Sequence, residues 1–311
     1  MFSIGLLRAA TLFCVGSVRG TMKNYKLSTI IVALCILLMI SALSAWHEYE
    51  DERDGIIIHV IDVGQADCMV IETQSGNIMI DTGTDISERA LRGYLQSHGL
   101  TKFAFLILTH PHDDHIGNAD MMLNEFDIER VIAADCTSDE TVWVNLMTAL
   151  SASHLRTGTE WIKPVSGTVC HLGTLRMEVL MAPSADNQGV NNDSLIVRMD
   201  YGECSLMLTG DAEAGEEELL LTAVSSDQLQ ADFLKVGHHG SSGSCSEAFL
   251  DAVSPRWAVI SCGESNSFSH PHEELLMRLR KRNIDIYRTD LHGSLRFFCD
   301  GKSFVLRSVL S

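Results

Sequence analysis

An apolar run, FAFLIL at residues 103–108, is followed after one threonine by HPHDDH at residues 110–115. The run is typical of a buried strand, so the histidines and aspartates are expected to converge at the mouth of that strand. Groups that repel one another when protonated can share such a turn if a cation shares their charge. Imidazole nitrogens and carboxylate oxygens are the ligands that Zn²⁺ and similar divalent ions select. The turn therefore predicts a metal site that can serve two adjacent ions.

Three further strand ends carry residues of the same kind. LMLTGD ends at Asp211, where an acidic helix begins, and LKVGHHGS places His238 and His239 between glycines. Asp211 suits a helix N-cap as well as a metal ligand, whereas a histidine pair beside glycines that permit close backbone approach favours a site. Asp81, at the end of NIMID, is either an Asx-turn residue or a carboxylate that orients a ligating imidazole.

Four more polar residues lie close to these motifs in the sequence. Each could stabilise an oxyanion as a cation or a hydrogen-bond donor, and an ordinary structural role is an equal alternative for each. They are Lys235, Ser241, Ser242 and His270.

Short β-branched runs alternate with amphipathic segments from residue 56 onward. Helices are expected at residues 85–98, 117–125, 138–153, 213–224, 245–253 and 272–282. Strands are expected in IIIHVIDVG, DCMVIET, NIMIDTG, FAFLILT, RVIAAD, TLRMEVLMA, SLIVRMD, CSLMLTG, DFLKVG, RWAVIS, DIYRT and SLRFFC. This order predicts an α/β fold of two mixed sheets stacked face to face with helices outside, in one domain over residues 56–311.

The segment before this domain reads as a membrane anchor or a signal peptide. Residues 27–45 form an uncharged run of 19 positions, close to the roughly 20 residues that one bilayer crossing needs. Basic residues precede the run and HEYEDERD follows it, which favours a cytoplasmic N-terminus and an extracytoplasmic domain. We therefore expect a basic tail at residues 1–26 and an acidic linker at residues 46–55.

Two alternatives remain open in this segment. The small residues Ala42, Ser44 and Ala45 at the end of the apolar run would suit cleavage of a signal peptide, and the domain would then be secreted. Met22, followed by KNYKLSTII, is a second candidate start of the chain.

The chain is strongly acidic, with a formal net charge of −18. Once the four basic residues of the first 45 positions are set aside, 19 basic and 41 acidic side chains leave −22 on the remainder. Such a surface repels nucleic acid and anionic lipid unless a local patch reverses it. We therefore expect nucleic acid only as a substrate, the membrane only through the N-terminal helix, and no evident protein partner.

Seven motifs in order resemble the metallo-β-lactamase-fold domain of the competence channel family ComEC, over residues 56–299. They are DVGQADCMVIE, MIDTG, THPHDDHIGN, NNDSLIVRMDYGECSLMLTGD, LKVGHHGS, SHPHEELLMRL and YRTDLHGSLRF. The resemblance implies an αββα sandwich with two divalent ions, Zn²⁺ or Mn²⁺, at one edge of the sheets.

The resemblance also implies how the ligands divide between the ions. His110 and His112 would hold the first ion, Asp114, His115 and one of His238 or His239 the second, and Asp211 would bridge both. A hydroxide between the ions, with a pKa lowered from 15.7 towards about 7, is the implied nucleophile. Asp114 and Asp211, together with Lys235 and His270 as oxyanion stabilisers, are the candidate catalytic residues.

One departure from the wider superfamily concerns the first ion. Many members supply a further histidine from the segment that reads APSADNQGVNNDSL here, where Asn191, Asn192 and Asp193 stand instead. Three consequences remain open for that ion, namely an open coordination position, weaker retention, or a preference for Mn²⁺ over Zn²⁺. Asn191, Asp81, Ser241 and Ser242 are expected to support the ligands.

The resulting hypothesis is a membrane-anchored or secreted dinuclear phosphodiesterase that acts on DNA, on a cell-envelope phosphodiester or on a small phosphoester. The missing histidine counts against hydrolysis of β-lactams. A hydrolase of a non-phosphate ester or amide is one alternative. A non-catalytic extracytoplasmic metal-binding or sensor module is the other.

Overall fold

The computed structural model describes residues 29–41, 54–134, 141–183 and 194–310, and the chain divides into two compact units, Met1–Asp51 and Glu52–Ser311. In the first unit, residues 29–41 form a helix. No helix within the described ranges is long and apolar enough to cross a membrane, so the expected spanning helix is not supported there.

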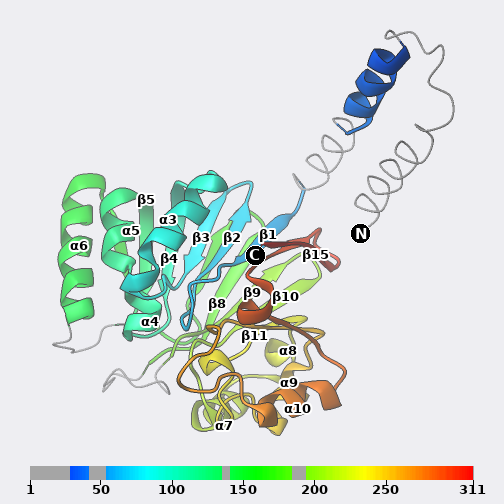
Figure 1. Ribbon diagram of the computed structural model, residues 1–311. Helices are drawn as coiled ribbons and strands as arrows, with labels where there is room; N and C mark the ends of the chain where they lie inside the picture. The colour runs from blue at the N-terminus through cyan, green and yellow to red at the C-terminus, as the bar shows by residue number, and fades with distance from the viewer. Residues whose placement is uncertain (1–28, 42–53, 135–140, 184–193, 311) are drawn as a thin grey trace. The chain divides into compact units, whose positions relative to one another are not determined.

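The second unit is built on two mixed sheets (Figure 1). The strand order of the first sheet is β15-β14-β1-β2-β3-β4-β5-β6. Its strands are β1 (Ile56–Val60), β2 (Met69–Thr73), β3 (Gly76–Ile80), β4 (Lys102–Leu108), β5 (Asp127–Ala133), β6 (Glu160–Ile162), β14 (Ser294–Cys299) and β15 (Phe304–Leu310). The pairs from β15 to β3 are antiparallel, and those from β3 to β6 are parallel.

The second sheet has the strand order β13-β12-β11-β10-β9-β8-β7. Its strands are β7 (Val169–Leu172), β8 (Leu175–Met181), β9 (Ile196–Tyr201), β10 (Cys204–Leu208), β11 (Phe233–Lys235), β12 (Trp257–Ile260) and β13 (Asp285–Arg288). The pairs from β10 to β13 are parallel, so the carboxyl ends of β10, β11 and β12 lie at one edge of this sheet. Side chains that follow these strands are thereby brought together, as at the switch points of other α/β folds.

Helices cover the outer face of each sheet. The first sheet is covered by α3 (Glu88–Ser97), α5 (Ala119–Glu125) and α6 (Thr141–Thr157), and the short α4 (Asp113–Ile116) leads into α5. The second sheet is covered by α7 (Ala214–Ala223), α8 (Ser226–Leu229), α9 (Glu247–Val253) and α10 (Glu273–Lys281). The described residues also include the one-turn helices η1 (Asp85–Ser87), η3 (His238–Gly240) and α11 (Thr289–His292).

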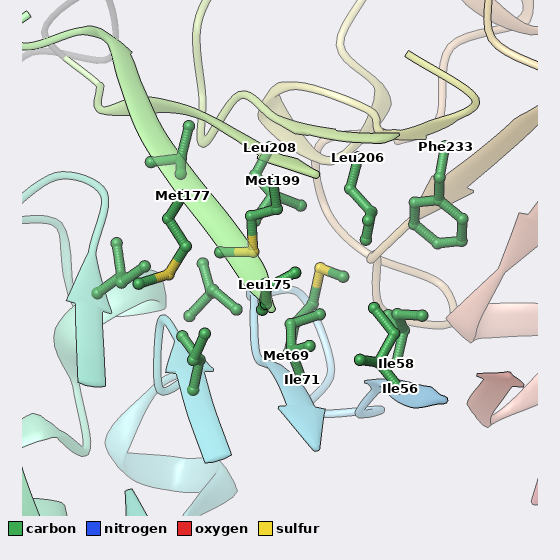
Figure 2. Packing of buried hydrophobic residues seen from close by; sticks show 14 of the residues in the cluster. Ile56, Ile58, Met69, Ile71, Leu175, Met177, Met199, Leu206, Leu208 and Phe233 are labelled. Atoms are coloured by element: carbon green, nitrogen blue, oxygen red, sulfur yellow. The ribbon is translucent and has the colours of Figure 1, made fainter. Parts of the chain in front are cut away.

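A continuous apolar core lies between the two sheets. Figure 2 shows Ile56, Ile58, Met69 and Ile71 of the first sheet facing Leu206 and other residues of the second. Separate apolar clusters lie between each sheet and its helices. The prediction of two mixed sheets with helices outside is therefore confirmed.

The sequence prediction erred at several elements. The strands β6, β7 and β15 and the short helices α8 and α11 were not predicted, and the helix expected at residues 117–125 begins only at Ala119. β6 and β7 have three and four residues, too few for a clear alternation. Helix α6 runs on to Thr157, whereas the expected residues 138–140 lie outside the described ranges.

Gly117 provides a test of packing at the start of this helical region. A methyl group there would lie 2.5 Å from the carbonyl oxygen of Asp113, 2.7 Å from the nitrogen of Asp85 and 2.7 Å from the carbonyl oxygen of Gly83. We expect Gly117→Ala to lower the free energy of unfolding by about 1–3 kcal/mol because backbone atoms must move apart. Urea unfolding of the chelated protein measures the change.

Gly93, on the exposed face of α3, is the matched control. A methyl group at Gly93 meets no atom within 4 Å, so Gly93→Ala should stabilise the helix by about 0.5–1 kcal/mol. Equal effects of the two substitutions would contradict this account of the Gly117 turn.

Candidate metal centre

The candidate site lies at the edge where β4, β10 and β11 end. The turn after β4 carries His110 to His115, the loop after β10 carries Asp211, and the loop after β11 carries His238 and His239. Asp81, His238 and His239 adopt left-handed backbone conformations, with φ of 55°, 48° and 51°. Such conformations are uncommon outside glycine and are concentrated at functional sites.

Four ligand-type side chains converge within this edge. One ligand atom from each of Asp114, His115, Asp211 and His239 lies within 4.8 Å of the others. The His115 Nε2 is 3.2 Å from the Asp211 Oδ1, and the His239 Nε2 is 3.2 Å from the Asp114 Oδ2. We call these four residues the ligand cluster.

The outer nitrogens of both cluster histidines are held by acceptors. The His115 Nδ1 lies 2.9 Å from the Asp81 Oδ2, and the His239 Nδ1 lies 3.0 Å from the carbonyl oxygen of Ser261. Because an ionised carboxylate and a carbonyl can only accept, each Nδ1–H donates, and each Nε2 is directed into the cluster. Partners of this kind fix the tautomer of metal-ligating histidines in known sites.

Two buried atoms of the cluster face each other at 3.2 Å without forming a hydrogen bond. Within the described residues, the His115 Nε2 and the Asp211 Oδ1 have no hydrogen-bond partner. Buried polar atoms are normally paired, and the nitrogen and the carboxylate oxygen are both ligands of divalent ions. The donor set of the cluster therefore fits a divalent cation.

Charge interactions within the cluster change its pKa values. Burial would raise the pKa of Asp211, but His115 and His239 hold it well below its usual range. Burial would lower the pKa of His239, but Asp211 and Asp67 raise it to about 10. Without a cation, the cluster histidines thus retain protons at neutral pH, and binding of a metal would release them.

His110 and His112 form a second, adjacent group of donors. The His110 Nε2 is 3.1 Å from the His112 Nδ1 and 3.8 Å from the Asp211 Oδ2. Burial holds the pKa of His110 well below its usual range, and His115 lowers it further. A neutral His110 beside His112 and Asp211 can offer a lone pair to a second ion.

The two adjacent histidines of the GHHG motif differ in position. His239 is buried and belongs to the ligand cluster. The side chain of His238 is 25% exposed, and its Nδ1 lies 2.9 Å from the Glu213 Oε1. His239, and not His238, therefore lies in the ligand cluster with Asp114 and His115, and the sequence left the choice between the two histidines open.

Lys235 does not lie where an oxyanion could reach it. Its Nζ is 2.7 Å from the Asp67 Oδ2, and it donates to the carbonyl oxygen of Val236 at 2.9 Å. The side chains of both Lys235 and Asp67 are almost fully buried, at 3% and 5% exposure. These contacts agree with the structural role that the sequence left open for Lys235 beside a role in stabilising an oxyanion.

Asp67 was missed by the sequence analysis although it lies in the DVGQAD motif. Its Oδ1 is 3.5 Å from the His239 Nδ1, and its Oδ2 is 3.9 Å from the His115 Nδ1. Burial opposes its charge, but Lys235 and His239 keep its pKa below the usual range. Asp67 therefore links the lysine to both histidines of the cluster.

The remaining expected residues lie at the margin of the site or outside it. The His270 ring centroid is 5.5 Å from that of His238, and burial together with His238 lowers the pKa of His270 to about 4. Ser241 is buried and its hydroxyl donates to Glu213 over 3.5 Å, whereas Ser242 is exposed and its amide donates to His272. Asn191 lies outside the described residues.

Removal of either partner of the Asp67–Lys235 pair should destabilise the protein. We expect Asp67→Asn and Lys235→Met each to lower the free energy of unfolding by about 3–5 kcal/mol because each leaves a buried charge without its partner. The double variant should lose less than the sum of the two. Urea unfolding in chelator measures all three variants.

The exposed pair Arg256–Asp285, with side chains 74% and 53% exposed, is the control. Arg256→Met should change the free energy of unfolding by less than about 1 kcal/mol. Strict additivity of the Asp67 and Lys235 substitutions would show that the two side chains do not interact.

Comparison with known proteins agrees with the motifs and the fold. The family model of the metallo-beta-lactamase superfamily matches residues 61–141. ComE operon protein 3 of Bacillus subtilis (strain 168) is 32% identical over 258 residues, which cover 77% of this chain and 32% of that protein. Recombination protein 2 of Haemophilus influenzae is 28% identical over 301 residues, which cover 94% of this chain and 35% of that protein.

A solved structure supports the fold independently of close sequence similarity. The metallo-beta-lactamase fold protein YhfI from Bacillus subtilis superposes with a TM-score of 0.53 at 12% identity, over 79% of this chain and 100% of YhfI. The chain spans about a third of the length of the curated relatives that it matches. It carries a metallo-β-lactamase domain of the ComEC family type.

Proposed function

We propose that this domain, a hydrolase of the metallo-β-lactamase superfamily, is a phosphodiesterase that cleaves single-stranded DNA with two divalent ions. The observation that carries the proposal is the ligand cluster, in which the His115 Nε2 and the Asp211 Oδ1 lie 3.2 Å apart and make no hydrogen bond within the described part of the chain. One relative is named recombination protein 2, and recombination acts on DNA. A cell-envelope phosphodiester is the alternative substrate.

The side chains divide into two groups of ligands under this proposal. Asp114, His115, Asp211 and His239 would hold one ion, and His110 and His112, with Asp211 between the groups, would hold the other. When bound, such a pair would supply an activated water and charge stabilisation for displacement at phosphorus. We propose Zn²⁺ as the ion, with Mn²⁺ as the alternative.

The residues around the ligand cluster would fix the orientation of these ligands and compensate buried charge. Asp81 and the carbonyl of Ser261 hold the outer nitrogens of His115 and His239, so both rings keep their position without a cation. Asp67 and Lys235 compensate each other below the site. His270 remains neutral at pH 7 because its pKa is lowered to about 4, so it would offer a neutral ring to the substrate.

A metal-dependence assay tests the proposed function. We expect the chelated protein to regain hydrolysis of bis(p-nitrophenyl) phosphate and single-stranded DNA when Zn²⁺ or Mn²⁺ is added back. Asp211→Asn should abolish this activity because Asp211 contacts both groups of ligands. Asp227→Asn, at an exposed position of α8, is the matched control and should leave the rate unchanged.

Other outcomes of this assay have distinct meanings. Turnover of p-nitrophenylphosphorylcholine but not of DNA would indicate that the substrate is a cell-envelope phosphodiester and not a DNA strand. Activity that survives Asp211→Asn would contradict the two-ion mechanism. A folded chain that binds well under one metal ion and cleaves none of the substrates would support the non-catalytic sensor module. Turnover of a carboxylic ester alone would support a hydrolase of non-phosphate esters or amides.

We further propose that residues 27–45 anchor the domain at the extracytoplasmic face of the membrane. The support is the sequence itself, namely an uncharged run with basic residues before it and acidic residues after it. In intact cells, external protease should then degrade the domain, and the chain should remain in the membrane fraction after a high-salt wash. Recovery of the full chain in the soluble fraction would contradict the anchor, and a shortened chain in the medium would indicate signal cleavage.

A further inference from the structure

We infer that Phe268 and His270 form a stacking subsite for a nucleobase next to the candidate metal centre. This inference rests on the proposed cleavage of single-stranded DNA. The side chain of Phe268 is 62% exposed, and its ring stacks on that of His270 with a centroid distance of 5.6 Å and an interplanar angle of 27°. We call these two rings the aromatic wall.

The aromatic wall continues directly into the metal centre. The His270 and His238 ring centroids are 5.5 Å apart, and the His238 Nε2 lies 3.8 Å from the Asp211 Oδ2. The Phe268 ring thus contacts His270, the His270 ring contacts His238, and His238 adjoins the ligand cluster. A nucleotide whose phosphate is held at the cluster could therefore place its base against this wall.

The loop that carries Phe268 is rigidly organised around Asn266. The Asn266 amide donates to the carbonyl oxygens of Gly263 and His270, and its oxygen accepts from the backbone N–H groups of Phe268 and His270. Hydrogen bonds within the loop thus keep Phe268 in an exposed position. Such internal hydrogen bonding is a feature of preorganised binding loops.

The same loop is packed against the loop that follows β1 and the loop that follows β11. A methyl group on Gly263 would lie 2.7 Å from the nitrogen of Gln65, and one on Gly240 would lie 2.4 Å from the Cβ of Pro271. The wall is therefore fixed relative to the loop that carries His239. Left-handed backbone at Ser265 and Ser269, with φ of 54° and 60°, adds local strain of the kind that is retained at ligand sites.

The charge of the protein explains why stacking would be needed. A chain with a net charge of −18 cannot attract a DNA strand by long-range electrostatics. Base stacking on aromatic side chains is independent of sequence and contributes about 1–3 kcal/mol per base by alanine substitution. Stacking on Phe268 would thus supply affinity that a basic groove supplies in other proteins.

The test compares two substrates with identical phosphates. One is a short oligothymidylate, and the other is a strand of the same length whose sugars carry no bases. We expect Phe268→Ala in the full chain to lower kcat/KM for oligothymidylate by about 5- to 150-fold, mainly through KM, because one stacking contact is lost. Cleavage of the base-free strand should not change, and Phe268→Trp should retain wild-type cleavage of both.

Leu155→Ala is the control for loss of an exposed apolar side chain, since Leu155 is 86% exposed on α6. It should leave both substrates unaffected. Equal effects of Phe268→Ala on the two strands, or no effect on either, would overturn the subsite while leaving the phosphodiesterase in place.

A binding measurement separates this inference from the proposed function. If the wild-type protein cleaves neither strand, the nuclease proposal fails, and fluorescence anisotropy in chelator then tests the wall alone. Tighter binding of oligothymidylate than of the base-free strand, weakened by Phe268→Ala, would support the subsite. Equal or undetectable binding of the two strands would overturn it.

Discussion

The buried carboxylate of Asp81 holds the candidate site in place. It lies at the end of β3 and accepts hydrogen bonds from the backbone and the hydroxyl of Thr109, at the end of β4, and from the ring of His115. Burial raises the pKa of Asp81, and His115 acts in the opposite direction. One side chain thus ties two neighbouring strands to the turn at residues 110–115, so the orientation of His115 depends on the register of the sheet.

The convergence of ligand-type side chains was predictable because they follow strands that are clear in the sequence. The crowded turn at residues 110–115 marks the end of β4, and Asp211 marks the end of β10. The choice between His238 and His239 was not predictable, because adjacent left-handed residues direct their side chains in ways that only the folded loop determines. Asp67 was missed for a related reason, since its importance arises from contacts with β11 and the loop after it that are distant in sequence.

Lys235 shows the limits of sequence patterns more sharply. A lysine before a histidine pair suggests a catalytic cation, but the pattern does not reveal how deeply the lysine lies or that a carboxylate already compensates it. The fold was better determined, because the alternation of short strands and amphipathic helices fixes two sheets with helices outside. Strands β6, β7 and β15 were not predicted. β6 and β7 are short, and β15 is the last strand of the described residues.

The distribution of charge links metal binding to substrate binding. Without a cation, the carboxylates of Asp114 and Asp211 are balanced by protons on His115 and His239, whose pKa values are raised above the usual range. These protons balance the carboxylates fully below the usual histidine pKa of about 6.5. The contribution of His239 is lost as the pH rises through its raised pKa of about 10. Metal ions would replace those protons with a larger positive charge. Under the proposed function, this acidic protein would accept a phosphodiester where its own ligands concentrate cations, and the aromatic wall beside them would add affinity without adding charge.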